Sequence, residues 1–143
     1  LGIMRIAEKS GLVQIISKVL YPVTKFLFKD VKKDSPAVGD IAMSVTANAL
    51  GLTNAATPIG LKVMKELQEE NPNKEKATDA MCMFLGMNTA GFQIIPATVI
   101  AVLVGAGASN PTDIILPTLI VTTLSFLTAI TAAIILRKIW RED

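Results

Sequence analysis

The sequence predicts an all-α integral membrane protein with discontinuous, re-entrant helices and an amphipathic interfacial helix at its N-terminal end. Apolar residues make up 51% of the 143 residues and charged residues 18%, a low charged share for a soluble domain, and the mean hydropathy is +0.51. Two runs, 80–112 and 114–136, contain no charged residue. Because about 20 apolar residues in a helix cross the hydrocarbon core of a bilayer, both runs are long enough to span it.

The N-terminal stretch 1–34 is basic and amphipathic, with seven Lys or Arg residues and three acidic ones. In a helix, one side would carry Leu12, Ile15, Ile16 and Val19, and the opposite side would carry Ser10, Gln14, Ser17 and Lys18. This pattern predicts a pair of amphipathic helices on the cytoplasmic surface of the membrane. The alternative is that the apolar side packs on another protein.

Segment 41–61 is uncharged but lies between two Lys-rich stretches. Lys and Arg favour the cytoplasmic side, so both flanks belong on that side. The 21 residues are too few for two crossings, which need about 40. We therefore expect a re-entrant helical hairpin, with one leg from near Pro36 to near Gly51 and the other from Thr57, as N-cap, to about Glu70. Its turn must be covered by protein, because irregular backbone is not tolerated in contact with lipid.

The next stretch, 62–79, is rich in charge and is broken by Asn71 and Pro72. It predicts a solvated cytoplasmic helix–turn–helix, with a docking role for a soluble partner as the alternative. A predicted span over 84–107 follows, and Gly91 and Pro96 should kink or interrupt it.

The last predicted span is Ile114–Leu136. Its start is indicated by Asn110 as cap, Pro111 at the first helical position and Asp113 two residues later. Because Lys and Arg flank this pair of spans but are absent between them, the turn at 105–113 should lie outside and the C-terminus in the cytoplasm.

Several kinds of chemistry are excluded by composition. The chain has no histidine and a single cysteine, Cys82, so Ser-His-Asp catalysis, imidazole metal sites and an intrachain disulfide cannot form. The uncharged spans also lack the acids and bases that intramembrane catalysis needs. We expect no enzyme activity, no metal and no cofactor. The net charge of +2 does not suggest nucleic acid as a partner.

Polar side chains in the two broken segments form the candidate ligand-binding site: Asn48, Asn54, Thr57, Asn88, Thr89 and Gln93. Discontinuous helices place such groups near the membrane midplane in many transporters. Amides both donate and accept hydrogen bonds, which suits a neutral polar solute such as a nucleoside. The alternative is that these amides cap helix ends and hold helices together. The two segments also share a short internal sequence similarity, GLTNAA at 51–56 and GMNTAG at 86–91.

Small residues recur at a spacing of four in the last span, at Ser125, Ala129 and Ala133. In membranes this spacing allows close helix approach and predicts an assembly surface, within this chain or with a partner. The cluster Met81, Cys82, Met83 and Met87 could offer soft ligands to Cu(I), but adaptable packing is the favoured interpretation.

Several motifs, in order along nearly the whole chain, resemble the spore-maturation members of the nucleoside-recognition (Gate) domain family. They are IAEKSGL at 6–12, GLTNAATPIGLK at 51–62, FLGMNT at 84–89, PATVIAV at 96–102 and PTDI at 111–114. The resemblance implies an integral protein of the bacterial inner membrane that supports dehydration of the spore core. It also implies a homologous Gate-domain partner, similar to spore maturation protein B.

Together, residues and resemblance predict a single Gate domain over 1–143, the C-terminal part of a longer membrane protein. The predicted function is a non-enzymatic gate or transport-associated component that recognises a small polar solute. The alternative is a scaffolding membrane protein that recruits a partner through its basic cytoplasmic face.

Overall fold

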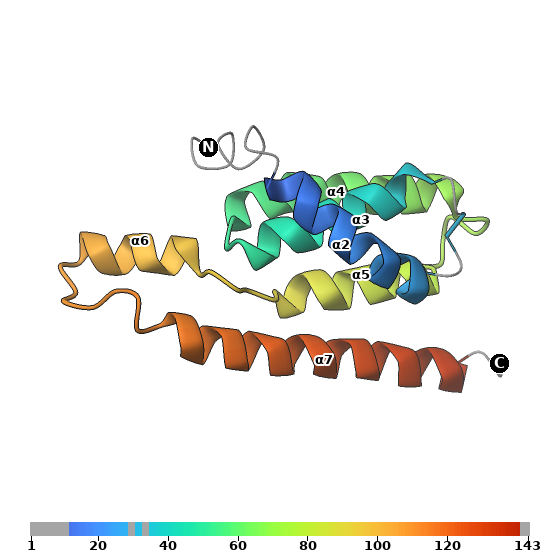
Figure 1. The fold of residues 1–143 in the computed structure, drawn as a ribbon. Coiled ribbons are helices and arrows are strands. Elements are labelled where there is room, and N and C mark those ends of the chain that lie inside the picture. The colour runs from blue at the N-terminus through green and yellow to red at the C-terminus, as the bar shows by residue number, and fades with distance from the viewer. Residues whose placement is uncertain (1–11, 29–30, 33–34, 141–143) are drawn as a thin grey trace.

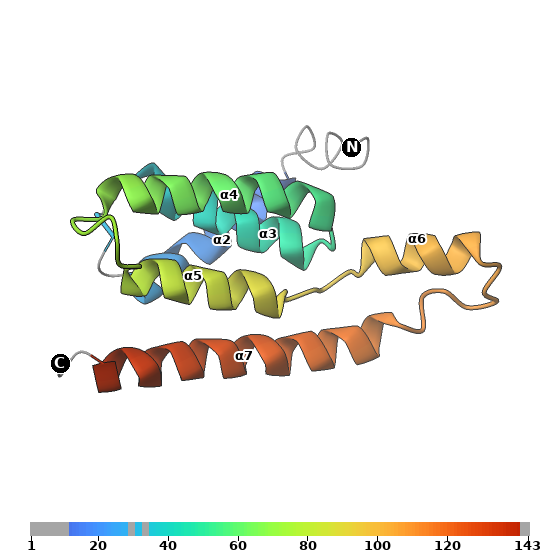
Figure 2. The ribbon, with the colours of Figure 1, turned by 180° about the vertical axis from the view of Figure 1, so that it is seen from behind.

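The computed structural model describes residues 12–28, 31–32 and 35–140, and this part of the chain is helical without strands. The helices are α2 (Leu12–Leu27), α3 (Pro36–Ala49), α4 (Thr53–Glu70), α5 (Asp79–Ala90), α6 (Ala97–Gly105) and α7 (Ile115–Trp140). The all-α prediction is therefore confirmed for the described residues. Helices α2 to α5 form a bundle, α7 runs beside α5, and α6 with the first part of α7 extends beyond the bundle (Figures 1 and 2).

Helices α3 and α4 form the predicted helical hairpin. Ser35 is the N-cap of α3, and its side chain accepts a hydrogen bond from the backbone of Ala37. The second leg begins earlier than predicted: Thr57 lies inside α4, which starts at Thr53, so its expected role as N-cap is wrong. A short turn centred on Gly51 replaces the predicted six-residue turn because glycine adopts the required φ of +66°. Pro58 is then accommodated in the second turn of α4, at the cost of one backbone hydrogen bond.

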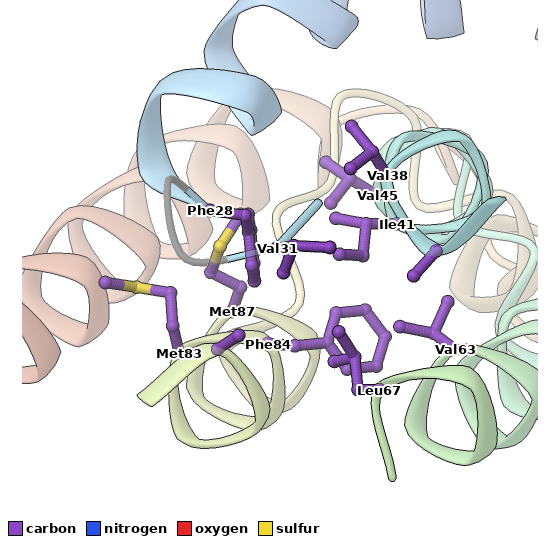
Figure 3. Packing of buried hydrophobic residues seen from close by; sticks show 12 residues of the cluster. Phe28, Val31, Val38, Ile41, Val45, Val63, Leu67, Met83, Phe84 and Met87 are labelled. Atoms are coloured by element: carbon purple, nitrogen blue, oxygen red, sulfur yellow. The ribbon is translucent and has the colours of Figure 1, made fainter. Parts of the chain in front are cut away.

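The core of the bundle lies where α3, α4 and α5 meet the end of α2 (Figure 3). Ile41 and Val63 are fully buried, and Phe84 is 2% exposed. Figure 3 shows Phe84 beside Val63 and Leu67 of α4 and near Ile41 of α3. Phe28 and Met87 lie on the opposite side of the apolar cluster. The hairpin is thus held on α5 by an apolar interface.

The predicted span over 84–107 is interrupted where expected. Helix α5 ends at Ala90 with Gly91 in the left-handed conformation, φ +60°, and α6 starts after Pro96. The intervening residues 91–96 form an extended break (Figure 2). Helix α4 ends at Glu70, so the predicted break at Asn71 and Pro72 is confirmed, but the second helix, α5, begins only at Asp79, the last residue of the stretch 62–79.

Helix α7 is the one helix among the described residues that is long and apolar enough to cross a membrane, over Ile115–Ile139. No residue of this segment is buried. Its start was predicted too early. Residues 111–114 form turns, with Asp113 N–H bonded to Asn110 O, so Pro111 is not at the first helical position. Pro117 instead lies in the first turn, where its missing N–H costs nothing.

The amphipathic N-terminal helix is present as α2, and the predicted second helix falls on residues outside the described part. Ile15, Val19, Val23 and Phe26 are exposed and share one side of α2. Thr24 is buried against the bundle. The apolar stripe predicted from Ile15 and Val19 therefore faces outward rather than toward α3.

Candidate functional site

The turn between α3 and α4 lies directly against the break between α5 and α6. The carbonyl of Ala49, at the end of α3, accepts hydrogen bonds from Ile94 N–H at 2.8 Å and Ile95 N–H at 3.1 Å. Thr98 Oγ1, in the first turn of α6, donates to Gly51 O at 2.8 Å. The hairpin turn is thus hydrogen-bonded to the break between α5 and α6, and we call this contact the break junction.

Gly51 is essential to this close approach. A Cβ atom built on it would lie 2.3 Å from Ile95 O and 2.6 Å from Ala97 N. Both neighbours are backbone atoms, so neither can move aside like a flexible side chain. The positive φ of Gly51 adds a second reason for glycine here.

Next to the junction, a small polar cluster joins α3 to α5. Asn88 Oδ1 accepts from Asn48 Nδ2 at 2.9 Å and from Ser44 Oγ at 3.3 Å. Ser44 is fully buried, and the two amides are half-buried. Gly60 on α4 lies against the Asn88 amide, since a Cβ there would meet Asn88 Nδ2 at 3.4 Å. Asn88 thereby contacts both legs of the hairpin.

The break is also tied to α7. Gln93 N–H donates to Thr122 Oγ1 at 3.2 Å, and the Thr122 hydroxyl lies 3.3 Å from Gln93 O and 2.8 Å from Thr118 O. The rings of Phe92 and Phe126 pack with centroids 5.6 Å apart. Thr122 and Phe126 lie in the first half of α7 (Ile115–Trp140) and near the middle of the apolar run 114–136, so the break lies beside that part of α7.

The structure brings together only part of the predicted site. Asn48 and Asn88 are in direct contact, and Gln93 is at the junction through its backbone. Thr57 is exposed on α4. The backbone of Asn54 lies in the first turn of α4, and its side chain is outside the described residues.

Thr89 points to a different place, a groove of about 710 Å³ between α5 and α7. Its small-residue lining includes Gly86, Ala90, Ser125 and Ala129. The predicted ridge at Ser125 and Ala129 therefore faces α5, and Ala133 packs against the core. Cys82, in the same groove, is exposed, and the described residues contain no group of three or more Cys, Asp or Glu side chains placed to hold a metal ion.

A charged cluster links the two hairpin legs, one turn or more from the amides. Lys62 Nζ on α4 lies 2.7 Å from Asp40 Oδ2 on α3 and 3.6 Å from Glu66 Oε1. Burial, together with the negative charge of Asp40, raises the pKa of Glu66 above its ordinary value. Close contact with Asp40 raises the pKa of Lys62. This cluster was not predicted from the sequence, because Asp40 lies 22 positions before Lys62 and 26 before Glu66.

The fold and the junction define a class: a helical protein with two helix breaks in contact and one helix apolar enough to cross a membrane. The chain belongs to the Gate family, described as nucleoside recognition, whose model matches residues 1–108. The family expected from the motifs is thereby confirmed.

Among curated proteins, the chain is similar to spore maturation protein A of Bacillus subtilis (strain 168), with 43% identity over 130 residues. The match covers 91% of this chain and 66% of that relative, so the chain spans just under two thirds of the relative's length. No solved structure matches the chain significantly.

Proposed function

We propose that the chain is a non-enzymatic gate in the bacterial inner membrane that controls passage of a small polar solute during spore maturation. The observation that carries the proposal is the break junction, in which the hairpin turn is hydrogen-bonded to an interrupted helix. Paired helix breaks free backbone groups at membrane depth, and transporters use such places to bind and gate solutes.

The geometry supports a re-entrant hairpin. Residues on both sides of the hairpin, Lys32 and Asn71, line one cavity of about 370 Å³ together with Arg137 near the end of α7. The hairpin therefore enters and leaves at the same end of the molecule. Helix α3 has 14 residues, about 21 Å, which is too short to cross a core of about 30 Å. Its turn meets the α5–α6 break beside the middle of the apolar run 114–136.

In this placement α7 crosses the bilayer and its basic end, Arg137 and Lys138, lies at the cytoplasmic surface. Helix α2 would lie at the interface with Ile15, Val19 and Phe26 toward lipid, and its exposed Lys18 and Lys25 toward headgroups.

The polar cluster supports recognition of an uncharged solute. Asn48 and Asn88 are half-buried amides without an acid or base beside them, so they can donate and accept hydrogen bonds but cannot neutralise a charge. The name of the family, nucleoside recognition, fits such chemistry.

The apolar surface leaves room for a membrane partner. None of the α6 side chains is buried, and Val102, Leu116 and Leu124 are exposed by 60% or more. Lipid and a homologous Gate-domain protein are the proposed neighbours of this surface.

The test replaces Asn48 or Asn88 with alanine in the chromosomal gene of a spore-forming host. Both variants should give spores of reduced core density at normal protein level, whereas Thr131→Ala, at an exposed position of α7, should not. Normal spore density in both Asn variants would contradict the gate. If charge reversal at Lys18 and Lys25 then lowered spore density, the scaffolding alternative would be favoured.

A further inference from the structure

The Asp40, Lys62 and Glu66 side chains hold the two hairpin legs together, and they are shielded unequally from water. The side chains of Asp40 and Glu66 are 15% and 16% exposed, whereas that of Lys62 is 61% exposed. One lysine faces two carboxyl groups, so the cluster has an excess negative charge when both carboxyls are ionised.

Two carboxyl oxygen atoms of this cluster, Asp40 Oδ2 and Glu66 Oε2, are inaccessible to solvent. Lys62 Nζ lies 2.7 Å from Asp40 Oδ2, within hydrogen-bond distance, whereas Glu66 Oε2 has no hydrogen-bond donor among the described residues. Two ionised carboxylates only accept hydrogen bonds. A single proton on either group would supply the missing donor and remove the excess charge, as in other close carboxyl pairs.

The cluster is also placed to act on the site. Asp40, Ser44 and Asn48 follow one another at a spacing of four on α3, so they lie on one side of the helix. Ser44 and Asn48 are the residues that donate to Asn88. A shift of α3 against α4 at Asp40 would therefore also move Ser44 and Asn48 and change their hydrogen bonds to Asn88.

We propose that Asp40, Lys62 and Glu66 form a proton-dependent clasp between the hairpin legs: one proton shared by the carboxyls keeps the legs closed, and its release to water loosens them and the break junction. This deepens the gate proposal and rests on it for its biological role. The clasp makes opening of the gate depend on pH on the hairpin side of the membrane.

No other charged side chain among the described residues forms an ion pair with Asp40 or Glu66. The remaining charged residues on α4 and on the packed helices α2 and α5 are Lys65, Glu69, Glu70, Lys18, Lys25 and Asp79. Asp79 pairs with Arg137, and within the described residues Asp40 and Glu66 form ion pairs with Lys62 alone.

The sign of the pH effect follows from the raised pKa of Glu66. The folded hairpin favours the protonated form, so the stabilisation is fully present below the ordinary glutamate pKa. It is lost as the pH rises through the raised value. Higher pH should therefore loosen the hairpin.

The first test is a carbon-13 NMR titration of the glutamate carboxyls, in the full chain reconstituted in lipid nanodiscs. Glu66 should titrate above the ordinary glutamate pKa, and Asp40→Asn should move the Glu66 midpoint down toward that ordinary value. A Glu66 midpoint at the ordinary glutamate value in the unaltered protein would overturn the shared proton, without need of any variant.

The second test follows the junction by spin-label distances between exposed positions Leu61 on α4 and Val99 on α6, in a Cys82→Ala background. The distance distribution should broaden between about pH 4 and about pH 8. Glu66→Gln should keep the narrow low-pH distribution at all values, whereas Glu69→Gln should respond like the unaltered protein. A response that persists in Glu66→Gln, or no response in the unaltered protein, would overturn the clasp.

Neither measurement requires a solute. If the clasp fails while the Asn48 and Asn88 variants still impair spores, only the pH dependence is lost. If the clasp holds while those variants are normal, the gate proposal is wrong and the clasp remains a property of the hairpin.

Discussion

Asn88 is the residue on which the most polar contacts of the site converge. Its Oδ1 atom accepts from Asn48 and Ser44, and its amide lies against Gly60. Ser44 is fully buried, so its hydroxyl depends on Asn88 for a partner outside its own helix. A buried donor that loses its acceptor typically costs about 1–3 kcal/mol.

We expect Asn88→Leu to lower the free energy of unfolding by about 1–3 kcal/mol, because Leu fills the space but accepts no hydrogen bond. Thermal unfolding in detergent or nanodiscs measures the change. The matched control is Thr89→Val, since Thr89 is exposed, and its effect should stay within about 0.5 kcal/mol. Equal melting temperatures for the two variants would show that the Asn88 cluster does not hold α3 on α5.

Gly51→Ala should be more damaging, by a few kcal/mol, because the added methyl group meets backbone atoms and the positive φ disfavours alanine. The same substitution at Gly39, where a Cβ meets nothing within 4 Å, should be neutral or slightly stabilising. The comparison of the two melting curves isolates the contact between the breaks. A Gly51→Ala protein as stable as Gly39→Ala would mean that the hairpin turn does not touch the α5–α6 break.

At the scale of elements, the broken helices are held at three points: Ala49 and Gly51 at the hairpin turn, Asn88 on α5, and Thr122 on α7. The Thr122 hydroxyl is the contact that comes from the candidate span. Without it, the amide of Gln93 would face an apolar environment without an acceptor, and such groups are costly inside a membrane.

Thr122→Val should therefore release the break, at a cost of about 1 kcal/mol. Hydrogen exchange reports it directly: the Gln93 amide should exchange several-fold faster. Thr131→Val is the matched control, because the exposed Thr131 hydroxyl donates to Leu127 O of its own helix. Unchanged exchange at Gln93 in Thr122→Val would indicate that α7 does not hold the break.

The positions of most helices could be predicted from charge and from proline and glycine. Gly91 and Pro96 correctly indicated the interrupted span, and the charge-free segment 41–61 indicated a hairpin. The helix starts were less predictable. Pro58 and Pro111 both suggested a first helical position, but packing against the break and the turns of 111–114 moved the starts to Thr53 and Ile115.

The site itself was predictable only in part. Asn48 and Asn88 were identified by their type, since buried amides need partners. The sequence did not identify three further contacts: the hydroxyl of Ser44 on Asn88, the carbonyl of Gly51 as acceptor, and the hydrogen bond from Gln93 to Thr122. Serine, glycine and threonine are common in membrane helices without any such contact. Contacts between residues 29 to 47 positions apart depend on the fold, which one sequence does not specify at that detail.

At the scale of the whole molecule, two parts differ in how their apolar surface is covered. The bundle of α2 to α5 has a core of its own, whereas no side chain of α6 or of the candidate span Ile115–Ile139 is fully buried. Helix α7 is 26 residues long, about 39 Å, enough to cross a bilayer of about 30 Å. The hairpin reaches only partway along it, and this difference in length is the basis of the re-entrant proposal.

The most direct test of the gate is the membrane topology of the hairpin. Single cysteines at Lys32, Lys74, Ser109 and Lys138, in a Cys82→Ala background, are labelled with an impermeant reagent in intact cells and in inverted vesicles. A re-entrant hairpin predicts that Lys32, Lys74 and Lys138 react only from the cytoplasmic side and Ser109 only from outside. If Lys32 and Lys74 react from opposite sides, the segment between them crosses the membrane, and a gate built on its turn is contradicted.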